Sequence, residues 1–185
     1  MGSQVIEALI WSSRDALIDA LQKGGNPNDG DSGSSALSLA CAQGRDDLAG
    51  DLVRHGARVD GTEEDETPPL HIAASLGNAQ LTELLIHAGA NVNAANDIGQ
   101  TPLMAGAKSG SIAVVTLLLQ ARANAMARDN NGRNALHWAL VGGDHPDIIA
   151  RLRKSGASSH ERTKEGQSPL DYAITLDRPD AATEL

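Results

Sequence analysis

Apolar residues return along the chain at a regular interval, with short polar and glycine-containing stretches between them. A leucine closes the same local pattern five times, at intervals of 33, 33, 33 and 34 residues: Leu37, Leu70, Leu103, Leu136 and Leu170. Two further apolar positions follow each of the first four leucines in register: Leu48 and Leu52, Leu81 and Leu85, Val114 and Leu118, Ile148 and Leu152. A constant interval of this length indicates a repeat architecture.

The stretch "DIGQTPLMAGAKSGSIAVVTLLL" at residues 97–119 shows the local structure expected of one repeat. Thr101 can cap a helix through its hydroxyl, and Pro102 suits the first helical position, where a missing N–H costs nothing. Gly110 suits the left-handed residue that ends a short helix, before a second helix begins. Glycines stand at the matching places of three other units: Gly44, Gly77 and Gly143.

Three departures from the repeat have local consequences. The segment "GGDHPDI" at residues 142–148 gains one residue, and Pro146 is expected to open the second helix there. Arg122 replaces a glycine where a positive φ is expected, at a cost of about 1 kcal/mol. Pro68 stands where the capping Thr is expected, so the hydrogen bonds at that helix start should differ from those of the other units.

Two short helices cannot bury their apolar faces alone, so each unit must stack on its neighbours. The 185-residue chain is 41% hydrophobic, but it has no Phe and only 2% aromatic residues. Its core is therefore expected to consist of Leu, Ile, Val and Ala in thin helical layers. The constant residues build this scaffold, and recognition of a partner must lie in the residues that vary.

The segment "TPPLHIAASLGNAQLTELLIHAGANVNAANDIGQTPL" resembles an ankyrin repeat of the TPLH and GADVN type, and the resemblance covers nearly the whole chain. It implies an all-α ankyrin-repeat solenoid of stacked helix-turn-helix units with projecting β-hairpin-like loops, whose usual work is to bind other proteins. Asp171 departs from the family's preferred His. The resemblance also implies that His71 and His137 tie neighbouring loops together by hydrogen bonds.

The repeats predict one domain over residues 1–185. Residues 1–28 align as a degenerate N-terminal capping unit without the cap motif, and residues 161–185 are either a truncated repeat or a C-terminal cap. The full repeats between them are expected at residues 29–60, 61–93, 94–126 and 127–160.

Charge and cysteine content narrow the class of partner and the compartment. A net charge of -9 argues against nucleic-acid binding, which needs clustered Lys and Arg. The charges are banded, because residues 59–107 contain seven acidic residues and no Lys or Arg, whereas residues 108–164 contain nine basic and four acidic residues. The single cysteine, Cys41, excludes an intrachain disulfide, and no secretion signal or membrane-spanning apolar stretch is evident. These features predict a cytoplasmic protein that is a monomer by itself and binds no membrane.

The sequence contains no recognisable catalytic, cofactor or metal site. The six histidines lack metal-ligand spacing, no serine lies in a G-x-S-x-G elbow, and the glycines do not form phosphate-binding loops. Cys41 falls at a tightly packed helix position and is expected to be an inert core thiol. We therefore expect no enzyme activity, no cofactor and no metal.

Two sets of variable residues are candidates for partner binding. One set should line the concave groove, where it is expected to supply large apolar side chains: Leu39, Ile72, Trp138 and Tyr172 at one repeat position, and Trp11 and Leu76 at another. The alternative for Leu39 and Ile72 is simple packing between neighbouring helices. The second set should lie at the hairpin tips: Glu63, Glu64, Asp65 and Ile98.

The acidic tip has two interpretations. In isolation it would be a solvated turn, but within the acidic band it predicts docking of a partner protein that presents a basic patch. The leading hypothesis is a protein-binding module without enzyme activity that acts sterically, in one version as an inhibitor or immunity-type protein. The alternatives are an interaction domain of a larger scaffold or secreted effector and, less favoured, an enzyme with a site in the groove.

Overall fold

The computed structural model describes residues 3–11, 13–31, 33–62, 65 and 67–185. Within these residues the chain forms twelve helices and one two-stranded antiparallel sheet. The helices occur as pairs: α1 (Gln4–Trp11) with α2 (Arg14–Gln22), α3 (Ala36–Ala42) with α4 (Asp46–Arg54), α5 (Pro69–Ser75) with α6 (Ala79–His87), α7 (Pro102–Ser109) with α8 (Ile112–Gln120), α9 (Ala135–Gly142) with α10 (Pro146–Lys154), and α11 (Pro169–Thr175) with α12 (Pro179–Thr183). The strands β1 (Gly30–Asp31) and β2 (Ser34–Ser35) precede α3.

The helix starts follow the capping chemistry of the sequence. The Thr101 hydroxyl accepts the backbone N–H of Met104, and Pro102 opens α7 as predicted. Pro146 likewise opens α10, which confirms the effect of the extra residue. Pro68 precedes α5 without any side-chain cap, because proline has no hydroxyl to offer.

The helix ends follow the predicted backbone conformations with one exception. Gly44, Gly77 and Gly110 are left-handed with positive φ, and Arg122 adopts φ 66 in place of a glycine. The prediction is wrong for Gly143, whose φ of 161 is extended backbone. The residue added before Pro146 lengthens this turn, so the chain leaves α9 in an extended form instead of reversing at once.

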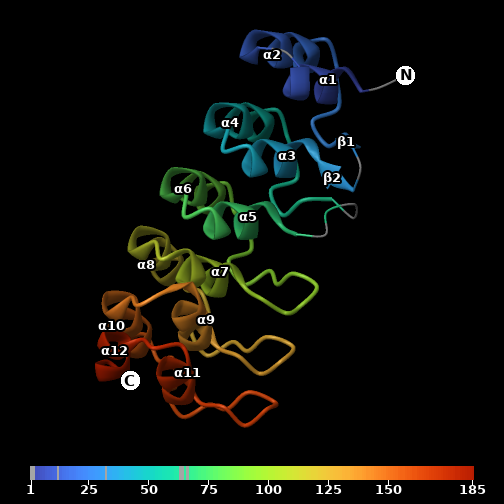
Figure 1. Cartoon of the computed structure of the whole chain (residues 1–185). Helices are drawn as coiled ribbons and strands as arrows, with labels where there is room; N and C mark the ends of the chain where they lie inside the picture. The colour runs from blue at the N-terminus through green and yellow to red at the C-terminus, as the bar shows by residue number, and fades with distance from the viewer. Residues whose placement is uncertain (1–2, 12, 32, 63–64, 66) are drawn as a thin grey trace.

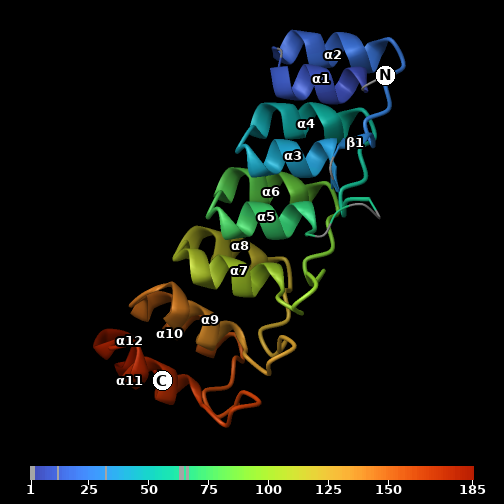
Figure 2. The same cartoon turned by 45° about the vertical axis from the view of Figure 1, so that its right-hand side comes forward.

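The helix pairs stack in a line, with the two termini at opposite ends of the stack (Figure 1). The first helices α3, α5, α7, α9 and α11 lie next to the projecting loops, and the second helices lie behind them (Figures 1 and 2). We call the face formed by these first helices and the loops the inner side. The stacked helices with projecting loops confirm the predicted fold class.

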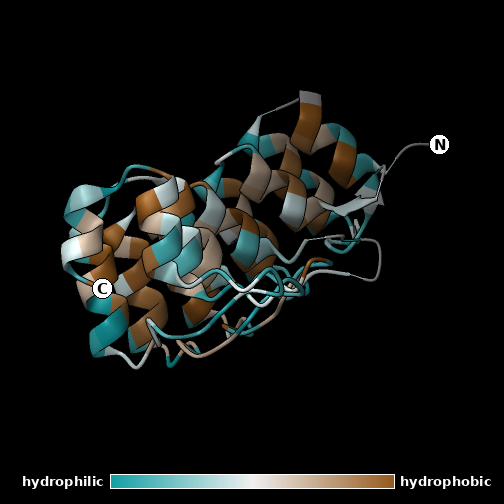
Figure 3. Cartoon of the chain, turned by 60° about the horizontal axis from the view of Figure 1, so that its bottom comes forward, coloured by the Kyte–Doolittle hydropathy of each residue, from teal (hydrophilic) through white to brown (hydrophobic). Residues whose placement is uncertain are grey.

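Most of the repeat leucines are buried in the core between neighbouring units. Leu37, Leu70, Leu103 and Leu136 are fully buried, whereas Leu170 in α11, the first helix of the last pair, is exposed. Apolar segments concentrate in the helices, and the loops are largely polar or neutral (Figure 3). No helix in the described residues has the length and apolar character needed to cross a bilayer.

Backbone hydrogen bonds join the projecting loops to one another. The N–H of Asn130 donates to the carbonyl of Ile98 at 3.0 Å, and the N–H of Lys164 donates to the carbonyl of Asn131 at 2.9 Å. These bonds hold the loops that contain Ile98, Asn130 and Lys164 in register with one another. Side chains on the inner side consequently hold defined positions along the stack.

Candidate protein-binding surface

The inner side presents several of the apolar side chains predicted to line a groove. Leu39, Ile72 and Tyr172 are half-buried, and Leu76, at the end of α5, is 53% exposed. Leu39 and Ile72 also contact the core cluster, so each packs between helices and keeps part of its surface free. The side chain of Trp11 lies outside the described residues.

Trp138 is the one predicted groove anchor that the structure contradicts. Its side chain is only 6% exposed, whereas the prediction required an accessible indole. The guanidinium of Arg133 stacks 4.1 Å from the ring centroid, and the Lys108 ammonium lies 5.4 Å from it. The indole N–H donates to a carboxylate oxygen of Asp129 at 3.1 Å. Cation–π contacts and this hydrogen bond therefore cover the ring and satisfy its polar atom.

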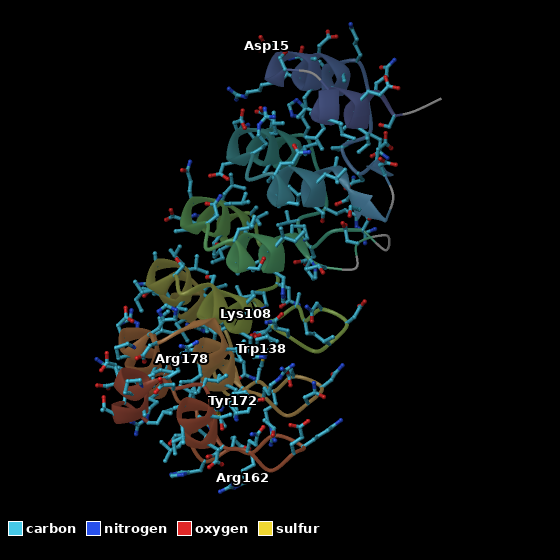
Figure 4. All side chains as sticks on the ribbon, viewed as in Figure 1. Asp15, Lys108, Trp138, Arg162, Tyr172 and Arg178 are labelled. Carbon is cyan, nitrogen blue, oxygen red and sulfur yellow. The ribbon has the colours of Figure 1, made fainter. Side chains whose placement is uncertain are left out.

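The burial of Trp138 has a cause in the backbone as well. Gly142, at the end of α9, approaches the Lys108 carbonyl so closely that a Cβ would collide with it. The glycine thus lets α9 pack against α7, which brings Lys108 over the indole from the preceding unit. Lys108, Trp138 and Tyr172 follow one another along the inner side (Figure 4).

Tyr172 keeps part of its ring accessible beside a small hollow. Its ring meets His137 edge-on, with 5.0 Å between centroids. A hollow of about 70 Å³ lies next to it, with Arg133 and Lys164 among its lining residues. Tyr172 is therefore a half-buried aromatic side chain beside cationic groups, in agreement with the basic band of the sequence.

The loop tips present both charge and apolar surface. Ile98 is 47% exposed at its tip. Asp65 is half-buried, and Glu63 and Glu64 lie outside the described residues. Of the predicted acidic tip, the structure describes Asp65 alone.

Asp65 is held by its neighbours as a carboxylate. The Ser35 N–H donates to Oδ1 at 2.8 Å, and the Thr62 N–H donates to Oδ2 at 2.6 Å. Burial raises the pKa of Asp65, but hydrogen bonds of this kind outweigh burial and leave its pKa below the ordinary value. The group therefore carries its negative charge at neutral pH.

Residues from both predicted binding sets line one hollow of about 460 Å³. It opens on the inner side between the units of α3 and α5, and its lining includes Asp65 from the loop and Ile72 from α5. Their positions in the repeat predicted two separate surfaces for these residues. In the structure they share one concave site, which offers a carboxylate next to aliphatic surface.

His71 also lines this hollow and was missed as a binding candidate. The side chain is 4% exposed, and its Nδ1 has no hydrogen-bond partner. The equivalent Nδ1 of His137 accepts the backbone N–H of Asn134 at 3.2 Å. Pro68 stands in the place of Asn134 and has no N–H, so the signal was present in the sequence.

Burial and spacing limit the chemistry open to the titratable side chains that the structure describes. No group of three His, Cys, Asp or Glu side chains that could hold a metal occurs in the part of the chain that the structure describes. Burial raises the pKa of the Cys41 thiol to about 12, which makes it a poor nucleophile. Burial also lowers the pKa of both His71 and His137.

The architecture defines a class of protein, the solenoid of stacked helix pairs with projecting loops. A family model for ankyrin repeats in three copies matches residues 5–96, 37–129 and 70–163. The chain therefore belongs to the ankyrin-repeat family, whose members are generally protein–protein interaction modules and typically have no enzyme activity. No curated protein matches the chain.

Proposed function

We propose that this chain binds a partner protein through the inner side and the loop tips and catalyses no reaction. The observation that supports the proposal is the row of incompletely buried apolar side chains on the inner side, next to a hollow of about 460 Å³. Large apolar side chains beside a polar rim are typical of binding hot spots. The sites proposed for contact are Leu39, Ile72, Leu76, Tyr172, Asp65 and Ile98.

The mechanism proposed is steric. A rigid stack that covers part of a partner can block its active site or another interface without forming a covalent bond. We infer an inhibitor or immunity-type role in the cytoplasm, with the chain as a monomer, and a partner that presents a basic patch toward the acidic band. The residue boundaries of the repeat units stay a prediction.

A capture experiment tests this function. The tagged chain is incubated with native lysate of its source, and bound proteins are quantified for the wild type, Leu76→Glu and Ile112→Glu. Ile112 is the matched control, because it is also an exposed apolar residue but lies at the start of α8, among the second helices. Leu76→Glu should release the partner, whereas Ile112→Glu should retain it.

The inhibitor role has its own readout. If the captured partner is an enzyme, its activity should fall in proportion to added wild-type chain and should recover with Leu76→Glu. Equal capture by the two variants, with both still folded by circular dichroism, would refute the inner side as the binding surface. Full enzyme activity of the partner at a saturating concentration of the chain would reject inhibition but would not contradict protein binding.

A further inference from the structure

Arg133 is a cation that two neighbouring side chains hold in a fixed position on the inner side. Its guanidinium stacks 4.1 Å from the centroid of the Trp138 ring, and its Nε donates to Oδ2 of Asp129 at 2.8 Å. The Asp129 side chain is fully buried, and its carboxylate also accepts the Trp138 indole N–H at 3.1 Å. Because both contacts fix the guanidinium, Arg133 loses little side-chain entropy when it binds a ligand. Trp138, predicted as an anchor for a partner, instead supports this cation.

The two terminal nitrogens of Arg133 are open to a ligand. Within the described chain neither has a hydrogen-bond partner, and neither is sealed from solvent. Trp138 covers one face of the guanidinium, and Asp129 accepts from Nε. The terminal edge is therefore left to line the hollow of about 70 Å³ beside Tyr172. A pair of N–H donors at this spacing matches the two oxygens of a carboxylate.

Other side chains around this small hollow supply charge and a further donor. Lys164 lines the hollow and has no ion-pair partner among the described residues. The Tyr172 hydroxyl has no hydrogen-bond partner in that part of the chain and is not sealed from solvent. Its ring is held edge-on by His137, with 5.0 Å between centroids. A fixed guanidinium edge, a hydroxyl and an ammonium therefore surround one small space.

The balance of charge favours an anion with a single negative charge. Among the described side chains that line the hollow, pair with Arg133 or cover the same indole ring, there are three cations, Lys108, Arg133 and Lys164, and two acids, Asp129 and Glu165. The excess of one positive charge matches a carboxylate. A phosphate ester carries nearly two negative charges, so it would exceed this balance and meet repulsion from Glu165.

The repeat indicates that Arg133 is not required by the scaffold. At the same position the other units have neutral side chains: Ser34, Thr67, Gln100 and Gln167. Neutral residues thus satisfy the fold at this position, and the charge of Arg133 is a feature of one unit only. A charge that the scaffold does not need is available for recognition.

We propose that Arg133, Tyr172 and Lys164 bind the carboxylate of an aspartate or glutamate side chain of the partner protein. This inference rests on the proposed function, because it names one chemical feature that the inner side recognises. The terminal edge of Arg133 donates to both carboxylate oxygens, and the Tyr172 hydroxyl donates to one of them. The Lys164 ammonium adds a positive charge beside them. The partner thus presents an acid here and its basic patch to the acidic band.

An NMR titration of the intact chain tests the site without knowledge of the partner. The probes are the N-acetyl methylamides of glutamate, glutamine and phosphoserine. The glutamate probe should shift the Arg133 Nε–H, the Trp138 indole N–H and the Lys164 backbone amide, with saturation in the millimolar range. The glutamine probe has nearly the same shape and no charge, so it should bind about tenfold more weakly. The phosphoserine probe should bind no more tightly than glutamate.

Variants assign the binding to individual groups. Arg133→Gln introduces the residue that the chain already has at Gln100 and Gln167, so the fold should persist while glutamate binding is lost. Arg151→Gln makes the same change of charge in α10, among the second helices, and should leave the affinity unchanged. Tyr172→Phe removes the hydroxyl alone and should weaken binding about fivefold.

Two further measurements connect the site to charge and to the partner. Lys164→Gln should weaken glutamate binding more at low salt than at high salt. In the capture experiment Arg133→Gln should lose the partner, whereas Arg151→Gln should retain it. Circular dichroism of each variant checks that the helices are intact, and the Tyr172→Phe and Lys164→Gln results decide the matter if Arg133→Gln does not fold.

Several results would overturn the carboxylate site. These are equal binding of the glutamine and glutamate probes, tighter binding of phosphoserine, an effect of Arg151→Gln as large as that of Arg133→Gln, or no saturable shift. Retention of the partner by a folded Arg133→Gln variant would do so as well. If Leu76→Glu still releases a partner while the glutamate probe fails, only the carboxylate site is wrong. If the probe binds but no partner depends on Leu76, the proposed function fails instead.

Discussion

A ladder of hydrogen bonds, one at each junction between units, connects the units behind the loops. This hydrogen bond is missing at one junction. At each of three successive junctions a side-chain oxygen of one unit accepts a backbone N–H of the next unit: Asn28 from Arg58 at 2.7 Å, Asp60 from Asn91 at 2.7 Å, and Asn93 from Asn124 at 2.8 Å. The register of the units places Met126 at the next position, opposite Ser158. A thioether is a weak acceptor, and among the described residues the Ser158 N–H donates no hydrogen bond.

Met126→Asn should therefore stabilise the protein. The substitution supplies an amide oxygen of the type that already serves at Asn93, and one such hydrogen bond contributes about 1 kcal/mol net. Little burial is lost, because the Met126 side chain is 72% exposed. Ser158 is already held in place within its own unit, since Nδ2 of Asn134 donates to its carbonyl at 2.7 Å. For a chain of this length, 1 kcal/mol corresponds to a rise of about 2–4 °C in Tm.

Urea unfolding followed by far-UV circular dichroism measures the gain, and amide hydrogen exchange locates it. Repeat arrays unfold through partly folded states, so the global midpoint alone is not decisive. The Ser158 amide should exchange more slowly in Met126→Asn than in the wild type. Met126→Ala is the control and should give neither effect. If the Asn variant matches the Ala variant in midpoint and in Ser158 exchange, the ladder does not stabilise this junction.

Three further predictions concern the cap, the thiol and the histidines. Thr101→Ala should lower stability by about 1 kcal/mol in chemical unfolding, because Met104 loses its cap acceptor, while Thr101→Ser should not. Cys41 should react with a thiol reagent at pH 8 only after denaturant is added, because burial raises its pKa to about 12. Burial lowers the pKa of His137, so the unfolded chain protonates first as pH falls below about 6.5 and stability decreases. His137→Gln should make that decrease smaller, and an unchanged pH profile would count against it.

The scaffold was predictable from the sequence because each constant residue has a local physical role. The cap at Thr101, the helix start at Pro146 and the positive φ of Arg122 all depend on chemistry within a few residues. The extended Gly143 was not predicted, since the inserted residue changes the path of the whole turn. Local patterns therefore predict elements well and predict irregular turns poorly.

The binding residues were harder to predict, because exposure depends on neighbours from other units. Trp138 occupies the same repeat position as Ile72, yet Arg133 and Lys108 cover its ring. Neither contact follows from the period, which places equivalent residues but not the long side chains around them. The convergence of Asp65 and Ile72 in one hollow is likewise a property of two adjacent units.

Met126 and Pro68 each remove a hydrogen bond that other units have. The bond lost at Met126 would join two units, the bond lost at Pro68 would lie within one unit, and their surroundings give the two losses different consequences. Met126 lies exposed to solvent, so water can serve the free N–H nearby and repair should alter stability only. Pro68 leaves the Nδ1 of His71 buried without a hydrogen-bond partner, where water cannot serve it, so repair there should alter stability by more. Pro68→Thr should thus be more stable than Pro68→Val, which has nearly the same shape, because only the threonine hydroxyl can cap α5 and hydrogen-bond the buried ring. Equal midpoints of urea unfolding for Pro68→Thr and Pro68→Val would show that the missing cap and the unpaired ring nitrogen cost this protein no stability.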